Sequence, residues 1–291
     1  MKALAFGEIL WDVIGNERKI GGAPLNVLGH IVQLGGTASV ISALGNDELG
    51  DESLEYLKSK NIDTKLVKRT EAETGKAIIT LKDGIPSYRF TDPSAWDEIT
   101  LTESELDEIR NTHYDAFIYG TLAARSDVSR RTWKQLLDNI NAGALFFDVN
   151  LRLSFYSKEV LGIGAKHADI LKVNDEELPM ILKLLEAEDI NELMKKYNLN
   201  MVLLTSGKAG SDIFTLDDHI HQDIGKVEVV DTVGAGDSLS AGFLYFLSKG
   251  NSLEKTLKKA SLLADYTVGR RGAIPEYDEY IENALKQGDS I

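Results

Sequence analysis

The chain has 291 residues with no cysteine, 43% hydrophobic and 27% charged residues, and a formal net charge of −14. The lack of cysteine excludes disulfides, zinc–thiolate sites and a cysteine nucleophile, and it is compatible with a reducing cytoplasm. The acidic balance argues against nucleic acid or an anionic membrane as a partner, and no run reaches the roughly 20 apolar residues that cross a bilayer.

Short apolar runs alternate with amphipathic segments along the chain. The first is interrupted by Glu8 and has no small-residue cleavage site after it, so it is not a signal peptide, and a cytoplasmic protein is expected. Nearly continuous apolar strands that alternate with helices predict an α/β fold with a mostly parallel sheet and helices on both faces. Strands are predicted at 2–7, 38–45, 115–120, 144–149, 168–173 and 200–207, and helices at 24–35, 49–62, 129–143 and 174–185.

Two segments depart from this alternation. Residues 14–22 and 75–90 have no helices between them and their neighbouring strands. The second is predicted to be a hairpin with its turn at the residues KDGI, 82–85. We expect a small separate sheet that covers the C-terminal edge of the main sheet, with a hairpin of no special role as the alternative. The chain is then one domain, residues 1–291, whose lid spans about 12–22 and 74–92.

A glycine-rich turn stands before an amphipathic run near the C-terminus. The sequence predicts a strand at 227–231, a tight turn, and a helix that begins at Asp237 and is closed by Gly250. Backbone N–H groups at such a helix start are unpaired and lie at the positive end of the helix dipole, so they suit a phosphate. The turn residues concerned are Gly234, Ala235 and Gly236. From this stretch alone, Asp237 is either a functional carboxylate or one favoured by the dipole.

The whole string DTVGAGD, residues 231–237, resembles the C-terminal signature of the PfkB, or ribokinase-like, family of carbohydrate kinases. Residues 21–36, GGAPLNVLGHIVQLGG, resemble the sugar-binding signature of the same family. KVNDEE at 172–177 and TSGKAG at 205–210 are similar to its Asn-x-x-Glu motif and its nucleotide-binding turn. The resemblance spans nearly the whole chain and implies a ribokinase-like fold with a small β-sheet lid.

The resemblance also implies a role for each matching residue. Asp237 is expected to be the general base that takes the proton from the sugar hydroxyl, and the turn before it to be the anion hole for the transferring phosphoryl group. Asn174 and Glu177 resemble the pair that organises magnesium-bound waters near the nucleotide phosphates. A plain helix N-cap with its capping-box partner is the alternative for these two.

Further ligand residues follow from the same motifs. A carboxylate and an amide suit neighbouring sugar hydroxyls, although a carboxylate like Asp12 alone is most often a solvated loop residue. The expected sugar-side residues are Asp12 after the first strand and Gly22 and Asn26 at the start of the next helix. The expected nucleotide-side residues are Thr205, Gly207 and Gly210, for which a simple strand-to-loop turn is the alternative.

The roles of three further residues, Arg152, Arg89 and Asp231, are less defined by the sequence. Arg152, at the end of DVNLR, and Arg89 in the lid either contact the sugar or a phosphate or are solvated surface residues. Residues 269–275 resemble the adenine-side loop of the family, whose carbonyls together with Asp231 hold a monovalent cation such as K⁺.

The residues GEILWD with GGAPLN resemble the bacterial fructokinase branch of the family. We therefore expect an ATP- and Mg²⁺-dependent kinase that phosphorylates a terminal hydroxymethyl oxygen, with D-fructose as the sugar. Because a D-x-N-x-R string also occurs in 2-keto-3-deoxygluconate kinases, that substrate and other sugars or nucleosides remain alternatives. A non-catalytic sugar or nucleotide sensor on the same scaffold is the alternative from another class. Lid residues such as Ile78 are a candidate homodimer contact.

Overall fold

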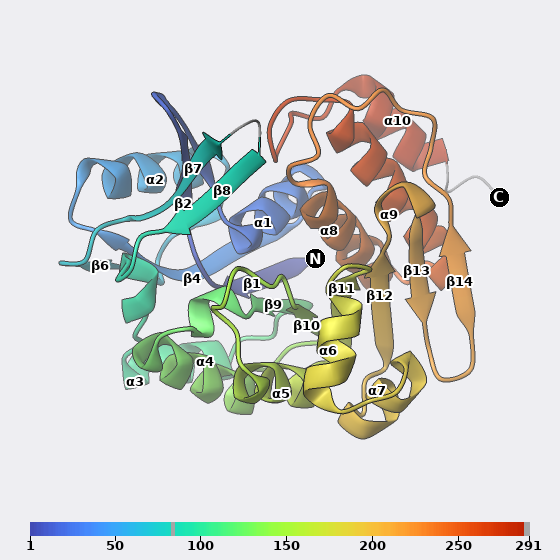
Figure 1. Cartoon of the computed structure of the whole chain (residues 1–291), viewed down its shortest axis with the longest axis horizontal. Helices are drawn as coiled ribbons and strands as arrows, with labels where there is room; N and C mark the ends of the chain where they lie inside the picture. Colours follow the sequence, from blue (N-terminus) through green and yellow to red (C-terminus); the bar gives the residue numbers. More distant parts are fainter. Residues whose placement is uncertain (83–84, 288–291) are drawn as a thin grey trace.

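The computed structural model describes residues 1–82 and 85–287. Within them, ten strands form a main sheet in the order β14-β13-β12-β11-β10-β9-β1-β4-β5, with β6 paired to β4 (Figure 1). The strands from β12 to β5 and β6 are parallel, while β13 and β14 are antiparallel. They are β1 (Lys2–Phe6), β4 (Thr37–Gly45), β5 (Ile62–Asp63), β6 (Val67–Thr70), β9 (Ala116–Gly120), β10 (Leu145–Asp148), β11 (Ile170–Asn174), β12 (Met201–Thr205), β13 (Ser211–Phe214) and β14 (His219–Gln222).

Helices cover both faces of this sheet, as the sequence predicts (Figure 1). Because side chains alternate along β1, Leu4 and Phe6 join one hydrophobic core while Ala3 and Ala5 join the other. The first core includes residues of α3 to α7, and the second includes residues of α1, α8 and α9. The helices are α1 (Ala23–Gln33), α2 (Glu48–Ser59), α3 (Glu103–Arg110), α4 (Asp127–Asn139), α5 (Lys158–His167), α6 (Leu178–Leu185), α7 (Ile190–Tyr197), α8 (Ala235–Ser248), α9 (Leu253–Val268) and α10 (Glu279–Gln287).

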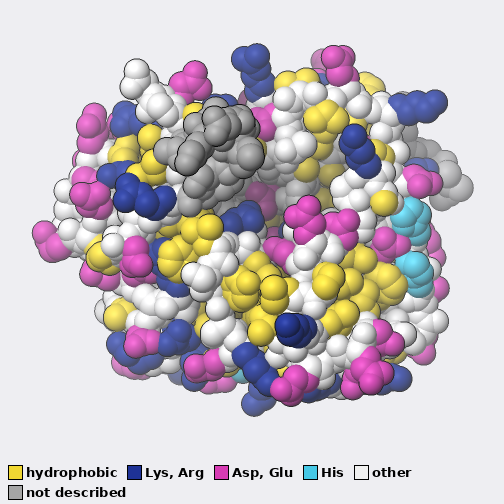
Figure 2. Space-filling model, viewed as in Figure 1, with side chains coloured by type: hydrophobic (Ala, Val, Ile, Leu, Met, Phe, Trp, Pro, Cys, Tyr) yellow, Lys and Arg dark blue, Asp and Glu magenta, His cyan; other side chains and the backbone are white. Residues whose placement is uncertain are grey.

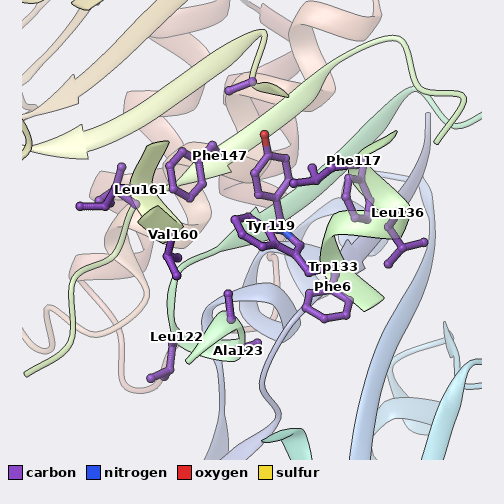
Figure 3. Packing of buried hydrophobic residues seen from close by; sticks show 14 of the residues in the cluster. Phe6, Phe117, Tyr119, Leu122, Ala123, Trp133, Leu136, Phe147, Val160 and Leu161 are labelled. Carbon is purple, nitrogen blue, oxygen red and sulfur yellow. The ribbon is translucent and has the colours of Figure 1, made fainter. Parts of the chain in front are cut away.

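Aromatic side chains fill the core under β9 and β10. Tyr119 on β9 stacks on Phe147 of β10, with ring centroids 5.2 Å apart, and also meets Trp133 of α4 (Figure 3). Trp133 and Phe147 have no exposed surface. Burying side chains of this size contributes roughly 1.5–3 kcal/mol each, so this packing fixes the neighbouring strand ends firmly.

The predicted small sheet is present, in the order β3-β2-β7-β8. Its strands are β2 (Leu10–Ile14), β3 (Glu17–Gly21), β7 (Gly75–Lys82) and β8 (Ile85–Phe90). The pairs β2–β3 and β7–β8 are antiparallel hairpins, and β2 runs parallel to β7. The expected turn of the second hairpin falls partly on residues 83–84, which lie outside the described residues. Figure 1 shows this sheet beside α1 and apart from the main sheet.

Two sequence-based element assignments are wrong. Residues 227–231 form no strand: the N–H groups of Val230 and Asp231 donate to the carbonyl of Val268 at 2.9 and 3.2 Å instead. The edge of the sheet next to β12 is occupied by the β13–β14 hairpin, which the sequence did not predict. Asp12 lies within β2 of the small sheet. The helix expected from residue 174 begins at Leu178, because a turn holds the preceding residues.

None of the helices in the described part of the chain is both long and apolar enough to cross a membrane.

Candidate active site

The C-terminal ends of the parallel strands meet the N-terminus of α8 at one edge of the main sheet. Asp148 ends β10, Asn174 ends β11 and Thr205 ends β12; Asn174 is in register with Thr205, and Asp148 is in register with Lys172, two residues before Asn174. Parallel sheets bind ligands at this edge, outside the carboxyl ends of their strands. In Figure 2 the molecule is hollowed between the lid and the body, with charged side chains at the bottom of the hollow.

The glycine-rich turn has the backbone that the sequence predicts for an anion hole. Gly234 is the N-cap of α8 with φ +81°, a left-handed conformation that favours glycine. A Cβ at Gly234 would lie 2.5 Å from the carbonyl oxygen of Ala273, so any side chain would displace the 269–275 loop. The N–H of Ala235 has only a 3.4 Å contact with the carbonyl of Thr232. The first-turn N–H groups of α8, which have no acceptor within the helix, therefore point outward at its positive end.

Asp237 lies in the first turn of α8 and accepts a 2.8 Å hydrogen bond from the side-chain amide of Asn26 on α1. Asn26 is buried, and its Oδ1 has no protein partner. The pKa of Asp237 is raised from 3.8 to about 6, because burial and, next, the Asp148 carboxylate raise it more than Lys172, Asn26 and Arg152 lower it. A carboxylate with a pKa of about 6 is ionised at neutral pH and still basic enough to accept a proton. The structure thus brings the two predicted residues together, 211 positions apart in sequence.

A buried ion pair that the sequence analysis did not assign stands beside this carboxylate. Nζ of Lys172 on β11 contacts the two carboxylate oxygens of Asp148 at 3.0 and 3.2 Å. The two residues are cross-strand partners: Asp148 ends β10, and Lys172 is the middle residue of β11. The same Nζ lies 3.4 Å from the position that a Cβ at Gly236 would take. The only sequence signal was that both residues fall within the motif strings already singled out.

The residues expected on the sugar side come from the small sheet and the start of α1. Asp12 on β2 is in register with Ala77 on β7, which is in turn in register with Phe90 on β8, so these side chains share one face of the lid. Burial raises the pKa of Asp12, while the charges of Arg152 and Lys19 lower it. Asp12 and Arg152 therefore lie within electrostatic range of each other.

Gly22 is required where the chain enters α1. It has φ +119°, and a Cβ there would lie 2.3 Å from the carbonyl oxygen of Glu8. The Glu8 side chain, 5% exposed, accepts a 3.3 Å hydrogen bond from the N–H of Ala23. Burial raises the pKa of Glu8 to about 7, although backbone N–H groups and the charge of Arg152 oppose this rise. Glu8 was not predicted as a functional residue, and it positions the helix that carries Asn26.

The two candidate arginines differ in their placement. Arg152 is exposed, but its charge lowers the pKa of Glu8, Asp12 and Asp237, so its guanidinium lies within electrostatic range of the three carboxylates. Arg89 is exposed and is in register with Ile78 on β7. Ile78 and Arg89 each lie one residue from Ala77 and Phe90, the residues in register with Asp12. Because strand side chains alternate, Arg89 lies on the other face of the lid, away from the site residues.

Asn174 and Glu177 form a reciprocal turn. The N–H of Glu177 donates to Oδ1 of Asn174 at 2.8 Å, and the N–H of Asn174 donates to Oε2 of Glu177 at 3.1 Å. The other carboxylate oxygen of Glu177 accepts a 2.7 Å bond from the N–H of Leu151, in the loop that carries Arg152. The two reciprocal bonds are those of the alternative interpretation, a helix cap. The bond to Leu151 also joins the motif expected to bind the nucleotide to the loop that carries Arg152.

The remaining predicted residues lie around the same edge. Thr205 is in register with Asn174, and the turn after it contains Gly207 at φ +49° and Gly210 at φ +95°. Asp231 accepts bonds from the N–H groups of Val233 at 3.0 Å and Gly272 at 3.1 Å. The carboxylate of Asp231 therefore joins the glycine-rich turn to the 269–275 loop.

Within residues 1–82 and 85–287, no group of three or more His, Cys, Asp or Glu side chains is arranged to hold a metal ion. This donor set still fits a hydrated magnesium ion, which keeps several waters and needs few carboxylates. Each oxygen of Glu177 accepts one N–H and retains a lone pair for a metal-bound water.

A glycine-rich helix N-terminus with an adjoining, partly desolvated carboxylate, at the carboxyl edge of an α/β sheet and beside a small separate β-sheet, fits a phosphotransferase. A family model described as pfkB family carbohydrate kinase matches residues 3–279. The chain belongs to this family, so it is a carbohydrate kinase, a phosphotransferase whose acceptor is an alcohol group.

Individual relatives agree with this assignment. The uncharacterized sugar kinase PH1459 of Pyrococcus horikoshii is 30% identical over 301 residues, which cover 96% of this chain and 94% of that protein. Fructokinase-2 of Zea mays is 29% identical over 303 residues, with 94% and 90% covered. The crystal structure of PH1459 superposes with a TM-score of 0.86 at 26% identity and covers 99% of both chains. An ATP-bound fructokinase from Xylella fastidiosa also gives 0.86, at 22% identity over 100% and 99%, which shows the shared fold.

Proposed function

We propose that the protein is an ATP-dependent sugar kinase that transfers the γ-phosphoryl group to a terminal hydroxymethyl oxygen, with D-fructose as the sugar. The observation that carries the proposal is the Asp237 carboxylate, held by Asn26 at 2.8 Å beside the first turn of α8. A base next to an anion hole is what phosphoryl transfer to a hydroxyl requires.

Each residue has a task in this reaction. An Asp237 oxygen accepts the proton of the sugar hydroxyl while that hydroxyl oxygen attacks the γ-phosphorus and the bond to the ADP oxygen breaks. The N–H groups of the Gly234–Gly236 turn receive the charge that develops on the phosphoryl oxygens. Asp12 and the free Oδ1 of Asn26 bind other sugar hydroxyls and hold the acceptor in line.

The nucleotide assignment rests on PH1459, whose ATP complex superposes with a TM-score of 0.80 at 28% identity over 94% of each chain. Magnesium supplies charge neutralisation of the nucleotide phosphates when it is bound with ATP. Asn174 and Glu177 are the residues of this chain that would hold its waters. Asp231, with the carbonyls of the 269–275 loop, is the corresponding proposal for a monovalent cation such as K⁺.

The fructose assignment is supported by the fructokinases among the relatives at about 30% identity. A coupled assay of ADP release with fructose, ribose, adenosine and 2-keto-3-deoxygluconate tests it. We expect fructose to give the highest kcat/KM. A higher value for 2-keto-3-deoxygluconate would assign Arg152 to a carboxylate instead, and no turnover with any sugar or nucleoside would favour the sensor alternative.

A further inference from the structure

The Lys172–Asp148 pair occupies a position that a stabilising role does not explain. Lys172 is 7% exposed and Asp148 is 4% exposed, so both charges are withdrawn from water. Desolvating two charges offsets most of their mutual attraction, and buried ion pairs are often no more stable than apolar residues of similar volume. Most strand interiors here carry apolar side chains, whereas this pair joins the last residue of β10 to the middle residue of β11, two positions before Asn174.

The ammonium of Lys172 lies where it can act on both halves of the phosphoryl-transfer site. It is next to Gly236 of the anion hole, and it is held there by two hydrogen bonds to Asp148. Asp148 and Asp237 both contribute to the raised pKa of Lys172, with Asp148 the stronger of the two. The ammonium therefore stays charged, hydrogen-bonded to the Asp148 carboxylate and within electrostatic range of the Asp237 carboxylate.

Asp237 is surrounded by charges of both signs from several elements. Asp148 raises its pKa, whereas Lys172, the amide of Asn26 and Arg152 lower it. The groups that face it are Glu8 after β1, Asn26 on α1, Asp148 at the end of β10, Arg152 in the following loop and Lys172 on β11. Lys172 and Asp148 have opposing effects on the pKa of Asp237, and the two residues are hydrogen-bonded to each other.

We infer that Lys172 is a positioning residue for catalysis, whose ammonium, held by Asp148 against the anion hole, keeps the Asp237 carboxylate ionised and ready to accept the sugar proton. The inference rests on the proposed function, in which Asp237 is the general base. It assigns opposite electrostatic effects to the two members of the pair: Lys172 favours the ionised base and Asp148 opposes it.

These opposite effects distinguish the proposed role from that of a salt bridge that only stabilises the fold. Lys172→Met and Asp148→Asn both break the pair, but they leave charges of opposite sign near Asp237. In the pH profile of kcat/KM with fructose and ATP, the wild-type acid limb is expected near pH 6, the pKa of Asp237. A unit charge within ~10 Å, at an effective dielectric constant of about 20, moves a pKa by roughly one unit. Lys172→Met should therefore move the acid limb up by roughly one pH unit, and Asp148→Asn should move it down.

Two further variants complete the test. Lys172→Arg keeps the charge and should keep the wild-type acid limb, and the double variant Lys172→Met/Asp148→Asn should return the limb close to its wild-type position. If the unpaired charge in Lys172→Met prevents folding, the downward shift of Asp148→Asn and its reversal in the double variant still decide the question.

Shifts of the two single variants in the same direction, or no shift in Asp148→Asn, would overturn the inference. Wild-type turnover is measured first in the same assay. If the wild type is active and the acid limb does not shift in these variants, only the role of Lys172 is overturned. If the wild type is inactive, the proposed function is overturned.

Discussion

Replacing Gly234 with alanine tests whether the glycine-rich turn forms the anion hole. Gly234 has φ +81°, and a Cβ there would lie 2.5 Å from the carbonyl oxygen and 2.6 Å from Cα of Ala273. The left-handed conformation alone costs roughly 1–2 kcal/mol for a residue with a Cβ. The clash is with backbone, so the turn or the 269–275 loop must also move, and the first N–H groups of α8 move with it.

The chain offers a matched control at the other end of the same helix. Gly250 has φ +76° and nothing within 4 Å of its Cβ position. Gly250→Ala should therefore lose only the conformational part, roughly 1 kcal/mol of unfolding free energy, and keep its turnover. Gly234→Ala should lose more stability and have kcat reduced about 10²–10³-fold, the usual effect of removing an oxyanion-hole donor.

Urea unfolding and the coupled kinase assay measure the two effects separately. Equal losses of stability in Gly234→Ala and Gly250→Ala, with wild-type kcat in both, would refute the role of the turn as an anion hole, because the turn would then tolerate displacement.

Three other predictions concern the sugar site, the entry to α1 and the lid. Asp12→Ala should impair sugar use more than ATP binding, because each lost hydrogen bond to a charged group costs about 1.5–3 kcal/mol; unchanged KM and kcat for the sugar would remove Asp12 from the site. The pKa of Glu8 is raised from 4.5 to about 7, so the wild type should lose up to about 3 kcal/mol of stability as pH rises from about 4.5 through 7. Glu8→Gln should lack that loss, and urea unfolding at pH 5 and pH 8 showing the same difference in both proteins would contradict it. Amide hydrogen exchange in residues 76–82 and 85–90 should slow when sugar and nucleotide bind, and equal exchange with and without ligands would count against a closing lid.

Much of the architecture could be predicted from local patterns. The apolar runs gave the parallel strands because both faces of the sheet are covered, and Leu4 and Ala5 do enter opposite cores. The lid was predicted from the missing helices around its two hairpins. The strand expected at 227–231 was wrong because Val229 and Val230 are exposed, Val229 by 58%, and the edge of the sheet next to β12 is occupied by the β13–β14 hairpin. Apolar alternation cannot reveal which edge of a sheet is already occupied.

The site shows a similar division. Motifs identified Asp237, Asn26 and the glycine turn, since their roles depend on residue type and spacing. The pairing of Lys172 with Asp148 depends on the register between two parallel strands, which a 21-residue connection leaves undetermined in the sequence. The bond from the N–H of Leu151 to Glu177 joins two loops in the same way. Contacts of this kind required the folded structure.

Turnover by Asp237→Asn tests the central claim most directly. The amide keeps the shape of the carboxylate and an oxygen that can accept the bond from Asn26, so the variant should fold and bind ATP and sugar nearly as the wild type does. It cannot accept the hydroxyl proton, and kcat should fall by roughly 10²–10⁴-fold, the usual contribution of a positioned general base. If Asp237 were only a residue favoured by the helix dipole, the variant would lose at most about 1 kcal/mol of stability and keep its rate. A folded Asp237→Asn protein with kcat within about threefold of wild type would contradict the mechanism.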